Sequence, residues 1–230
     1  MNRMIIDTET ANSIECPLPY DVGYIIFDDE TGEELCSRSF VVEEIFNDGE
    51  LMASAYYAEK IPLYLAKLAA GECISLPIAA IRRRLAEDCK TYNVTAVGAY
   101  NMGFDRRATR NDVRYISGSL IKWFFPYGVE TFCIWNMACT SILRTEDYIF
   151  WAMENGLVSS KLNIQTSAEA AYRYITKDNT FDEAHTGLED ARIEKAIYMA
   201  IRNSGMAYDA SVKAFPWRKV AAAKRIYYGV

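Results

Sequence analysis

Near the N-terminus the chain reads Ile5-Ile6-Asp7-Thr8-Glu9-Thr10, an apolar segment that turns acidic. Residues 3–10 are predicted to form a strand that enters the core with its two isoleucines. Asp7 and Glu9 are two positions apart, so both side chains leave the same face of this strand. Carboxylates in apolar surroundings repel each other and are costly to bury, and hard divalent cations prefer such oxygen ligands. Two solvated acids at a strand end are the commoner explanation of this pattern alone.

The elements expected around this strand indicate an α/β fold. Strands at 22–27 and 35–42 complete an antiparallel meander, because turn residues separate these two segments. Pro62 is expected to break or kink a helix at 50–69. Further along the chain, the pattern predicts a short buried strand at 95–100 and helices at 75–92, 102–116, 146–155, 167–174 and 187–203. Strands followed by helices and further strands are typical of a single α/β domain.

Composition excludes several classes of protein. The 230 residues are 51% hydrophobic and 24% charged, which is an ordinary globular balance, and no apolar run approaches the roughly 18 residues that span a bilayer. The first residues lack the apolar stretch of a signal peptide. The six cysteines contain no CxxC pair, which argues against a zinc site or a redox dithiol and favours a cytoplasmic location. Because His185 is the only histidine, a mechanism that needs two is excluded.

Charge is unevenly distributed along the chain, whose net charge is −6. Residues 1–60 carry 3 basic and 14 acidic side chains, a net of −11, whereas residues 82–114 carry 8 basic and 4 acidic ones, a net of +4. Residues 206–230 carry 5 basic and 1 acidic side chain, again a net of +4. This asymmetry allows one face to attract an anion, although an acidic solvated hairpin with compensating charge elsewhere explains it equally well.

The C-terminal segment interleaves basic and aromatic residues. Such a composition suits single-stranded nucleic acid, because rings stack on bases and cations follow phosphates. A terminal helix that packs Phe215, Trp217, Val220 and Tyr227 onto the domain is the somewhat simpler interpretation. The basic and aromatic residues concerned are Lys213, Phe215, Trp217, Arg218, Lys219, Lys224, Arg225, Tyr227 and Tyr228.

A second acidic motif follows the predicted strand 95–100. Asn101 is a good N-cap for the next helix, which places Asp105 in the first turn of that helix. The helix dipole favours an aspartate there, so Asp105 needs no catalytic explanation. Three arginines lie roughly on one face of the same helix, where they either bind phosphates or form a solvated surface. They are Arg107, Arg110 and Arg114.

The most informative stretch is His185-Thr186-Gly187-Leu188-Glu189-Asp190. Thr186 and Glu189 fit a capping box, which makes His185 the residue before the cap and Asp190 the fourth residue of the helix. These two positions touch in a hydrophobic staple, so the pattern predicts an imidazole beside a carboxylate. A helix N-terminus disfavours a cationic histidine, and a neutral imidazole can accept a proton as a general base does. A partly exposed histidine that bonds to its neighbour is the alternative.

Three motifs in this order, using the only histidine, resemble those of the DnaQ-like DEDDh 3′–5′ exonucleases. This family includes a proofreading subunit of a bacterial DNA polymerase and ribonuclease T. The matching stretches are Ile5–Thr10, Tyr100–Asp105 and His185–Ala191, and the resemblance runs from residue 4 to about residue 200. Residues 117–165 and 206–230 match no motif of the family.

The resemblance implies a ribonuclease H-like fold with a central five-stranded mixed sheet flanked by helices. It also implies two divalent cations, Mg²⁺ or Mn²⁺. Asp7, Glu9 and Asp190 would hold the first cation, and Asp7 would bridge to the second, which Asp105 would support. Two such cations can stabilise both the attacking and the leaving oxygen of an in-line displacement at phosphorus.

The implied activity is removal of nucleoside 5′-monophosphates from the 3′ end of nucleic acid. His185 would deprotonate the attacking water, while Thr10 would contact the terminal nucleotide and Asn101 the nucleotide or its surroundings. Single-stranded 3′ ends are the expected substrate, and a polymerase or another replication or recombination protein is compatible as a partner. We expect residues 1–205 to form the exonuclease domain and 206–230 a basic, aromatic extension packed on or near it.

Two other functions are compatible with the sequence. A catalytically silent nucleic-acid-binding or adaptor module would share the fold, although all five motif positions are filled here. A metal-dependent hydrolase of nucleotides rather than polymers is the other. Use of a polymer predicts a basic, aromatic-lined track leading to the carboxylates, whereas use of a small molecule predicts a closed pocket.

Overall fold

The computed structural model describes residues 1–120 and 123–220. Contacts within the chain divide it into two units, which are described separately. The first unit comprises Met1–Gly98, Phe104–Thr131 and Ala184–Arg192. The second comprises Ala99–Gly103, Phe132–Glu183 and the described residues from Ile193 on. In this part of the chain, no helix is both long enough and apolar enough to cross a membrane.

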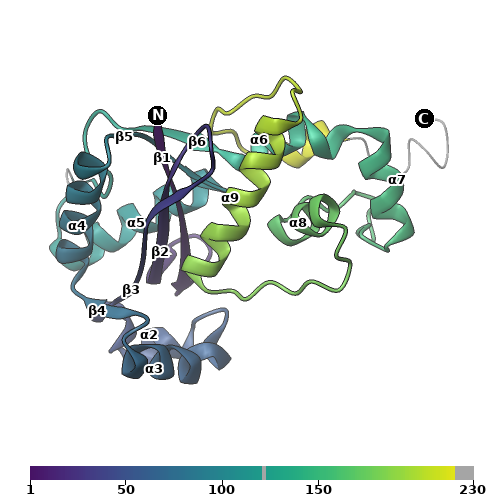
Figure 1. The fold of residues 1–230 in the computed structure, drawn as a ribbon. Helices are drawn as coiled ribbons and strands as arrows, with labels where there is room; N and C mark the ends of the chain where they lie inside the picture. The colour runs from purple at the N-terminus through teal and green to yellow at the C-terminus, as the bar shows by residue number, and fades with distance from the viewer. Residues whose placement is uncertain (121–122, 221–230) are drawn as a thin grey trace. The chain divides into compact units, whose positions relative to one another are not determined.

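A mixed β-sheet forms the framework, and the predicted meander is its largest part. The antiparallel strands β1 (Asn2–Ala11), β2 (Leu18–Asp28) and β3 (Glu34–Val42) lie side by side (Figure 1). Parallel pairing adds β5 (Val94–Ala99) to β1 and β4 (Ile74–Leu76) to β3. With β6 (Glu130–Cys133), the strand order is β4-β3-β2-β1-β5-β6. The α/β fold class is confirmed.

The described residues form six strands, so the expected number of five is wrong. The additional edge strand β4 overlaps the start of the helix predicted at 75–92. A proline pushes the residue before it away from the helical region, so Leu76 is extended and the helix α4 (Ile78–Thr91) begins only after Pro77. β4 pairs in parallel with the last three residues of β3, Phe40 to Val42, along the edge of β3 that β2 does not occupy.

The single helix predicted at 50–69 is also wrong. Three short helices replace it, namely α2 (Gly49–Ala53), η1 (Ala58–Lys60) and α3 (Ile61–Ala70), and α1 (Glu43–Phe46) precedes them. Pro62 lies in the first turn of α3, where its missing N–H is not needed. The proline therefore begins a helix instead of kinking one.

The register of the meander assigns side chains to the two faces of the sheet. Asp7 pairs with Gly23 and Glu9 with Asp21, so the side chains of Asp7, Glu9 and Asp21 share one face, which is open at Gly23. Thr8 pairs with Val22 on the other face. The two acids predicted to share a face of β1 therefore do so.

Helices cover both faces in the first unit. On the Thr8 face, the Tyr24 hydroxyl donates a hydrogen bond to Asp88 of α4 at 2.8 Å, and Thr8 bonds to α5 (Met102–Ser117) through Asp105. On the other face, the first turn of α9 (Gly187–Asn203) packs against Gly23. The first turn of α9 is thus placed on the face that carries Asp7 and Glu9.

The second unit is mainly helical. It contains α6 (Ile134–Thr140), η2 (Ile142–Arg144), α7 (Glu146–Glu154) and α8 (Ala168–Thr176). Thr145 and Ser167 cap the last two of these helices, because their side chains accept hydrogen bonds from backbone N–H groups of the first turn.

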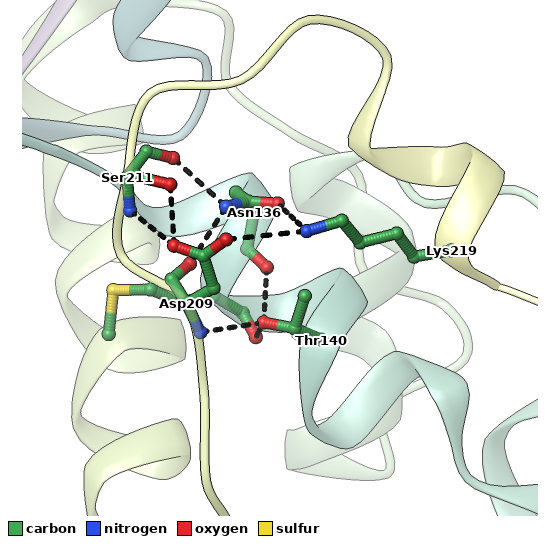
Figure 2. Close-up of polar contacts among 6 residues, drawn as sticks. Asn136, Thr140, Asp209, Ser211 and Lys219 are labelled. Atoms are coloured by element: carbon green, nitrogen blue, oxygen red, sulfur yellow. Dashed lines mark hydrogen bonds and ion pairs between the residues drawn. The ribbon is translucent and has the colours of Figure 1, made fainter.

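The C-terminal segment is anchored to α6 in this unit (Figure 2). The Asn136 side chain donates hydrogen bonds to the carbonyl oxygens of Asp209 and Ser211, both at 2.9 Å. The Lys219 ammonium donates to Asn136 Oδ1 at 3.1 Å and pairs with Asp209 at 3.4 Å. Lys219 is therefore engaged within the chain, as the packing interpretation of this segment requires.

The remaining expectations for this segment have mixed outcomes. Up to residue 220, where the described part of this segment ends, the chain forms a short 3₁₀ helix, η3 (Pro216–Lys219), and the rest of the expected terminal helix lies outside the described residues. Val220 is buried, whereas Phe215 is 57% exposed, so its predicted packing is wrong. Four residues of the predicted binding segment lie outside the described residues, namely Lys224, Arg225, Tyr227 and Tyr228.

Candidate metal centre and active site

Three of the five predicted site residues come together in the first unit. Glu9, His185 and Asp190 each offer one ligand atom, and these atoms all lie within 4.8 Å of one another. Glu9 and His185 are half-buried, while Asp190 is only 4% exposed. Two carboxylates and an imidazole at this distance can hold a divalent metal ion, because carboxylate oxygens and imidazole nitrogen are common ligands of such ions.

The other two predicted site residues lie outside this group of three. Asp7 is half-buried on the same face of β1 as Glu9. Asp105 is 3% exposed in the first turn of α5, and its Oδ1 accepts a hydrogen bond from the Thr8 hydroxyl at 2.8 Å. Since Thr8 points to the opposite face from Glu9, Asp105 reaches β1 from the side of α5. The pairing of β1 with β5 ends at Ile5, so the part of β1 that carries Thr8 is accessible to α5.

The protonation of Asp105 is unusual for an aspartate. Burial raises its pKa to about 7, although the hydrogen bond from Thr8 acts in the opposite direction. A buried carboxyl that titrates near neutrality is a feature of functional sites, and it is also found in structural ones.

Two glycines, Gly23 of β2 and Gly187 of α9, bring α9 against the sheet. A Cβ atom on Gly23 would lie 2.0 Å from the carbonyl carbon of Gly187 and 2.0 Å from the nitrogen of Leu188. A Cβ atom on Gly187 would lie 2.7 Å from the backbone nitrogen of Gly23 and 3.0 Å from the backbone carbonyl oxygen of Asp7. Only glycine permits this contact between backbones, and the contact places His185 and Asp190 beside the acidic face of β1.

Asp21 anchors the beginning of α9. Its Oδ2 atom accepts hydrogen bonds from the Gly187 N–H at 2.7 Å and from the Tyr64 hydroxyl at 2.6 Å. Burial nevertheless raises the pKa of Asp21 to about 6. An acceptor from a distant strand thus satisfies one of the free N–H groups at the helix start.

The predicted capping box has a different set of contacts. The Thr186 hydroxyl donates to the Glu189 side chain, and Lys67 also donates to this carboxylate at 2.9 Å. Although partial burial acts to raise it, the pKa of Glu189 is lowered by these two hydrogen bonds. Thr186 and Glu189 therefore do interact, through side chains, and α3 contributes a lysine that the sequence pattern did not reveal.

Tyr57 is a further neighbour of the site that the motifs did not indicate. Its ring stacks on His185, with centroids 4.1 Å apart and an angle of 14° between the planes. His185 has a φ of 52°, and Lys60 donates a hydrogen bond to the carbonyl of Ala184 at 3.1 Å. A left-handed backbone is costly for a residue with a side chain and persists only where its surroundings fix it. The stack on Tyr57 supports the imidazole, and the bond from Lys60 supports the backbone of the preceding residue.

The two predicted substrate-binding residues have different surroundings. Thr10 is half-buried and follows a shift in strand register between Glu9 and Thr10, where β2 contributes Tyr20 as an extra residue. Such bulges re-aim side chains and are frequent beside active sites. Asn101 is exposed in the turn before α5 and belongs to the second unit.

The arginines predicted to share a face of α5 have three different environments. Arg107 bonds to the carbonyl of Ile14 at 3.1 Å, and Arg114 bonds to that of Leu120 at 3.4 Å. Arg110 lies over the ring of Trp123, with its guanidinium carbon 4.4 Å from the ring centroid. Arg107 also lies over a ring, with its guanidinium carbon 5.5 Å from the centroid of Phe104, so two of the three arginines combine their charge with an aromatic surface.

Comparison with known proteins bears on the fold. No protein-family model and no curated protein sequence matches the chain. Among solved structures, the 3′-exonuclease that recognises the 3′ end of the histone mRNA stem-loop aligns with a TM-score of 0.60 at 10% identity, over 91% of this chain and 84% of that one. The nuclease domain of 3′hExo, a DEDDh family member bound to rAMP, gives 0.56 at 13% identity, over 93% and 97%.

A third similar structure is larger. The complex of Escherichia coli exonuclease I with single-stranded DNA, in a zinc-bound form, gives a TM-score of 0.52 at 15% identity, and the alignment covers 89% of this chain. The chain spans only 41% of the length of that protein. These three solved structures are thus of exonucleases, and the chain shares their α/β fold, which is ribonuclease H-like.

Proposed function

We propose that the protein is a metal-dependent 3′–5′ exonuclease of the DEDDh type that releases nucleoside 5′-monophosphates from single-stranded 3′ ends. The observation that carries this proposal is the group formed by Glu9, His185 and Asp190 on a fold shared with 3′–5′ exonucleases. Chain order supports it too, since these residues come from the first strand and from the start of a late helix.

We propose two divalent cations, Mg²⁺ or Mn²⁺, as cofactors. Asp7, Glu9 and Asp190 would hold one, and Asp7 with Asp105 would contribute to the other. When bound, such cations neutralise the carboxylates and stabilise the charge that develops on the phosphate oxygens. The donor set fits this role, because carboxylate oxygens are the ligands that hard divalent ions prefer.

The remaining chemistry is assigned to His185. Its imidazole takes a proton from water, the water oxygen forms a bond to the phosphorus of the terminal nucleotide, and the bond to the 3′-oxygen of the preceding nucleotide breaks. The stack on Tyr57 fixes the plane of the imidazole for this transfer. Thr10 and Asn101 are proposed to position the terminal nucleotide.

The proposal extends to the organisation and context of the protein. Residues 1–205 would form the exonuclease domain, with 206–230 as an extension. A cytoplasmic location and a polymerase or another replication or recombination partner are compatible with this activity.

The decisive experiment is digestion of oligonucleotides labelled at the 3′ or the 5′ end. Single- and double-stranded DNA and RNA are incubated with Mg²⁺, with Mn²⁺ or with EDTA. We expect stepwise loss from the 3′ end with a metal and none in EDTA. Asp190→Ala should abolish this activity and leave the fold intact, because removal of one clustered carboxylate relieves repulsion. The exposed acid Glu30 provides a matched control, and Glu30→Ala should retain full activity.

Two results would contradict the proposal. Full activity in excess EDTA would exclude the metal-dependent mechanism. Binding of oligonucleotides without any cleavage in Mg²⁺ or Mn²⁺ would identify a catalytically silent binding module.

A further inference from the structure

A second site-like feature of the first unit lies between α4, α5 and the segment 123–131. It is a hollow of about 980 Å³. On α4 the lining positions are 79, 82, 83 and 86, which follow one face of the helix. The hollow belongs to the helices on the Thr8 face of the sheet, whereas Glu9, His185 and Asp190 lie at the opposite face.

The charge of this hollow is strongly positive. Four arginines line it, Arg82 and Arg83 from α4 and Arg106 and Arg110 from α5, and no acidic side chain does. Among the described residues, none of these four makes an ion pair with a carboxylate. In a protein with a net charge of −6, four arginines without anionic partners form a local site for an anion.

Aromatic residues form the other wall. Trp123 is 54% exposed and carries Arg110 on its face, and Tyr127 is fully exposed. The Nε atom of Arg110 is buried, and it has no hydrogen-bond partner in the described chain. Large exposed rings beside cations are the features on which single-stranded nucleic acid binds, since bases stack on rings and phosphates pair with the cations.

We propose that this arginine–aromatic groove, defined by Arg82, Arg83, Arg106, Arg110, Trp123 and Tyr127, binds a stretch of single-stranded nucleic acid upstream of the 3′ end that is cleaved. The link to cleavage rests on the function proposed above, whereas binding in the groove does not. The first turns of α5 run from the candidate active site to the groove. Asp105 bonds to β1, and Thr109, one turn later on the same helix, lines the groove. Along the axis of α5, Arg110 follows Asp105 by about 7.5 Å.

The first experiment measures binding without catalysis. A fluorescent oligothymidylate of about 12 nucleotides, within the roughly 4–16 that one single-strand site covers, is titrated with the protein in EDTA at several salt concentrations. We expect Trp123→Ala to weaken binding by about 5- to 150-fold, the value of one stacked base. Arg83→Glu should weaken it and flatten the slope of log affinity against log salt by about 0.7 per lost phosphate contact.

A matched control comes from the next residue of the same helix. Arg84 is also exposed on α4 but does not line the groove. If the groove is the site, Arg84→Glu leaves affinity and salt slope close to those of the unmodified protein. Equal losses for Arg83→Glu and Arg84→Glu would show a diffuse charge effect and overturn the proposal. So would unchanged binding in both the Trp123 and the Arg83 variant.

The second experiment separates the groove from the catalytic site. With a dinucleotide substrate, Trp123→Ala and Arg83→Glu should leave kcat and KM unchanged, because the substrate is too short to reach the groove. With the longer oligonucleotide, KM should rise by a factor similar to the loss of affinity, while kcat is retained. If the protein cleaves nothing but the binding losses are found, the groove stands and the proposed exonuclease activity fails. A polyglutamate peptide that displaces the oligonucleotide at similar concentration would instead identify an acidic protein as the ligand.

Discussion

The two faces of the sheet in the first unit differ in charge and in how their functional groups are held. On the α9 face, acids and the single histidine are fixed by contacts between backbones, with Gly23 against Gly187. On the α4–α5 face, arginines and exposed rings surround an open hollow, and their side chains have no anionic partners among the described residues.

This difference follows from what each proposed role requires. A catalytic group must be held within a fraction of an ångström, so it depends on rigid elements and close packing. A surface that follows a strand of any sequence needs charge and stacking area, and flexible arginines suffice for that.

The close approach of α9 to β2 gives the largest expected effect. In Gly23→Ala, the new methyl group would lie 2.0 Å from two backbone atoms of the first turn of α9, so the helix must move or the fold is lost. We expect a loss of about 3 kcal/mol or more in the free energy of unfolding, measured with urea, together with loss of nuclease activity. Gly49→Ala is the control, because nothing lies within 4 Å of a Cβ there, and stability should change by less than about 1 kcal/mol. A Gly23→Ala protein of normal stability and activity would show that the backbone contact does not position α9.

The imidazole on this face gives the next effect. His185→Ala is expected to lower the cleavage rate by about 10²–10⁴-fold, the usual contribution of a general base, while Mn²⁺ affinity measured by calorimetry is retained. Added imidazole should restore part of the rate in the variant. A large loss of Mn²⁺ affinity would instead make His185 a metal ligand, which its distance to Glu9 and Asp190 also permits.

The sequence predicted the elements whose pattern is local. Apolar segments at 3–10 and 22–27, together with the alternation in 35–42, identified the meander. The pattern of Thr186 and Glu189 located the start of α9. β4 was missed because three residues are too few to show a period. The sequence predicted one helix at 50–69 because apolar residues continue across the breaks between α2, η1 and α3.

Contacts between distant segments were not predictable in this way. The carboxylates and the histidine were found as motifs, but their support comes from Gly23, Asp21 and Tyr57, which carry no motif of their own. Trp123 and Tyr127 likewise lie in a region without periodicity, and their relation to Arg82 and Arg83 depends on the packing of α4 and α5. Such pairings arise from the tertiary fold, for which a single sequence gives no direct signal.

A buried acid on the α4–α5 face gives a smaller, pH-dependent effect. Asp112 is fully buried on α5, and neither carboxylate oxygen has a hydrogen-bond partner in the described chain. Burial, with a further contribution from the charge of Glu44, raises the pKa of Asp112 from its ordinary value of 3.8 to about 8. Between these values the folded protein holds a proton that the unfolded chain releases, so stability is lost as the pH rises.

Asp112→Asn tests this effect, because the variant has no proton to lose. Relative to the unmodified protein, we expect its free energy of unfolding to increase as the pH rises from 4 to 8, because only the unmodified protein loses stability over this range. Urea unfolding of both proteins at several pH values measures the difference, and the other buried acids, such as Asp105, cancel because both proteins contain them. Parallel pH curves for the two proteins would mean that Asp112 is ionised and stabilised when buried.

The smallest expected effect concerns Lys219, a basic residue of the second unit. Lys219 is positively charged like the groove arginines, but it is paired with Asp209 and bonded to Asn136 (Figure 2). Both partners of the ion pair are about two-fifths exposed, so Lys219→Ala should cost about 0.2–1 kcal/mol in the free energy of unfolding. Because its charge is already engaged, the variant should keep the salt slope of oligonucleotide binding that Arg83→Glu flattens. A flattened slope in Lys219→Ala would extend the nucleic-acid surface to the C-terminal segment, and the contrast between a basic composition and a basic binding site would then no longer hold.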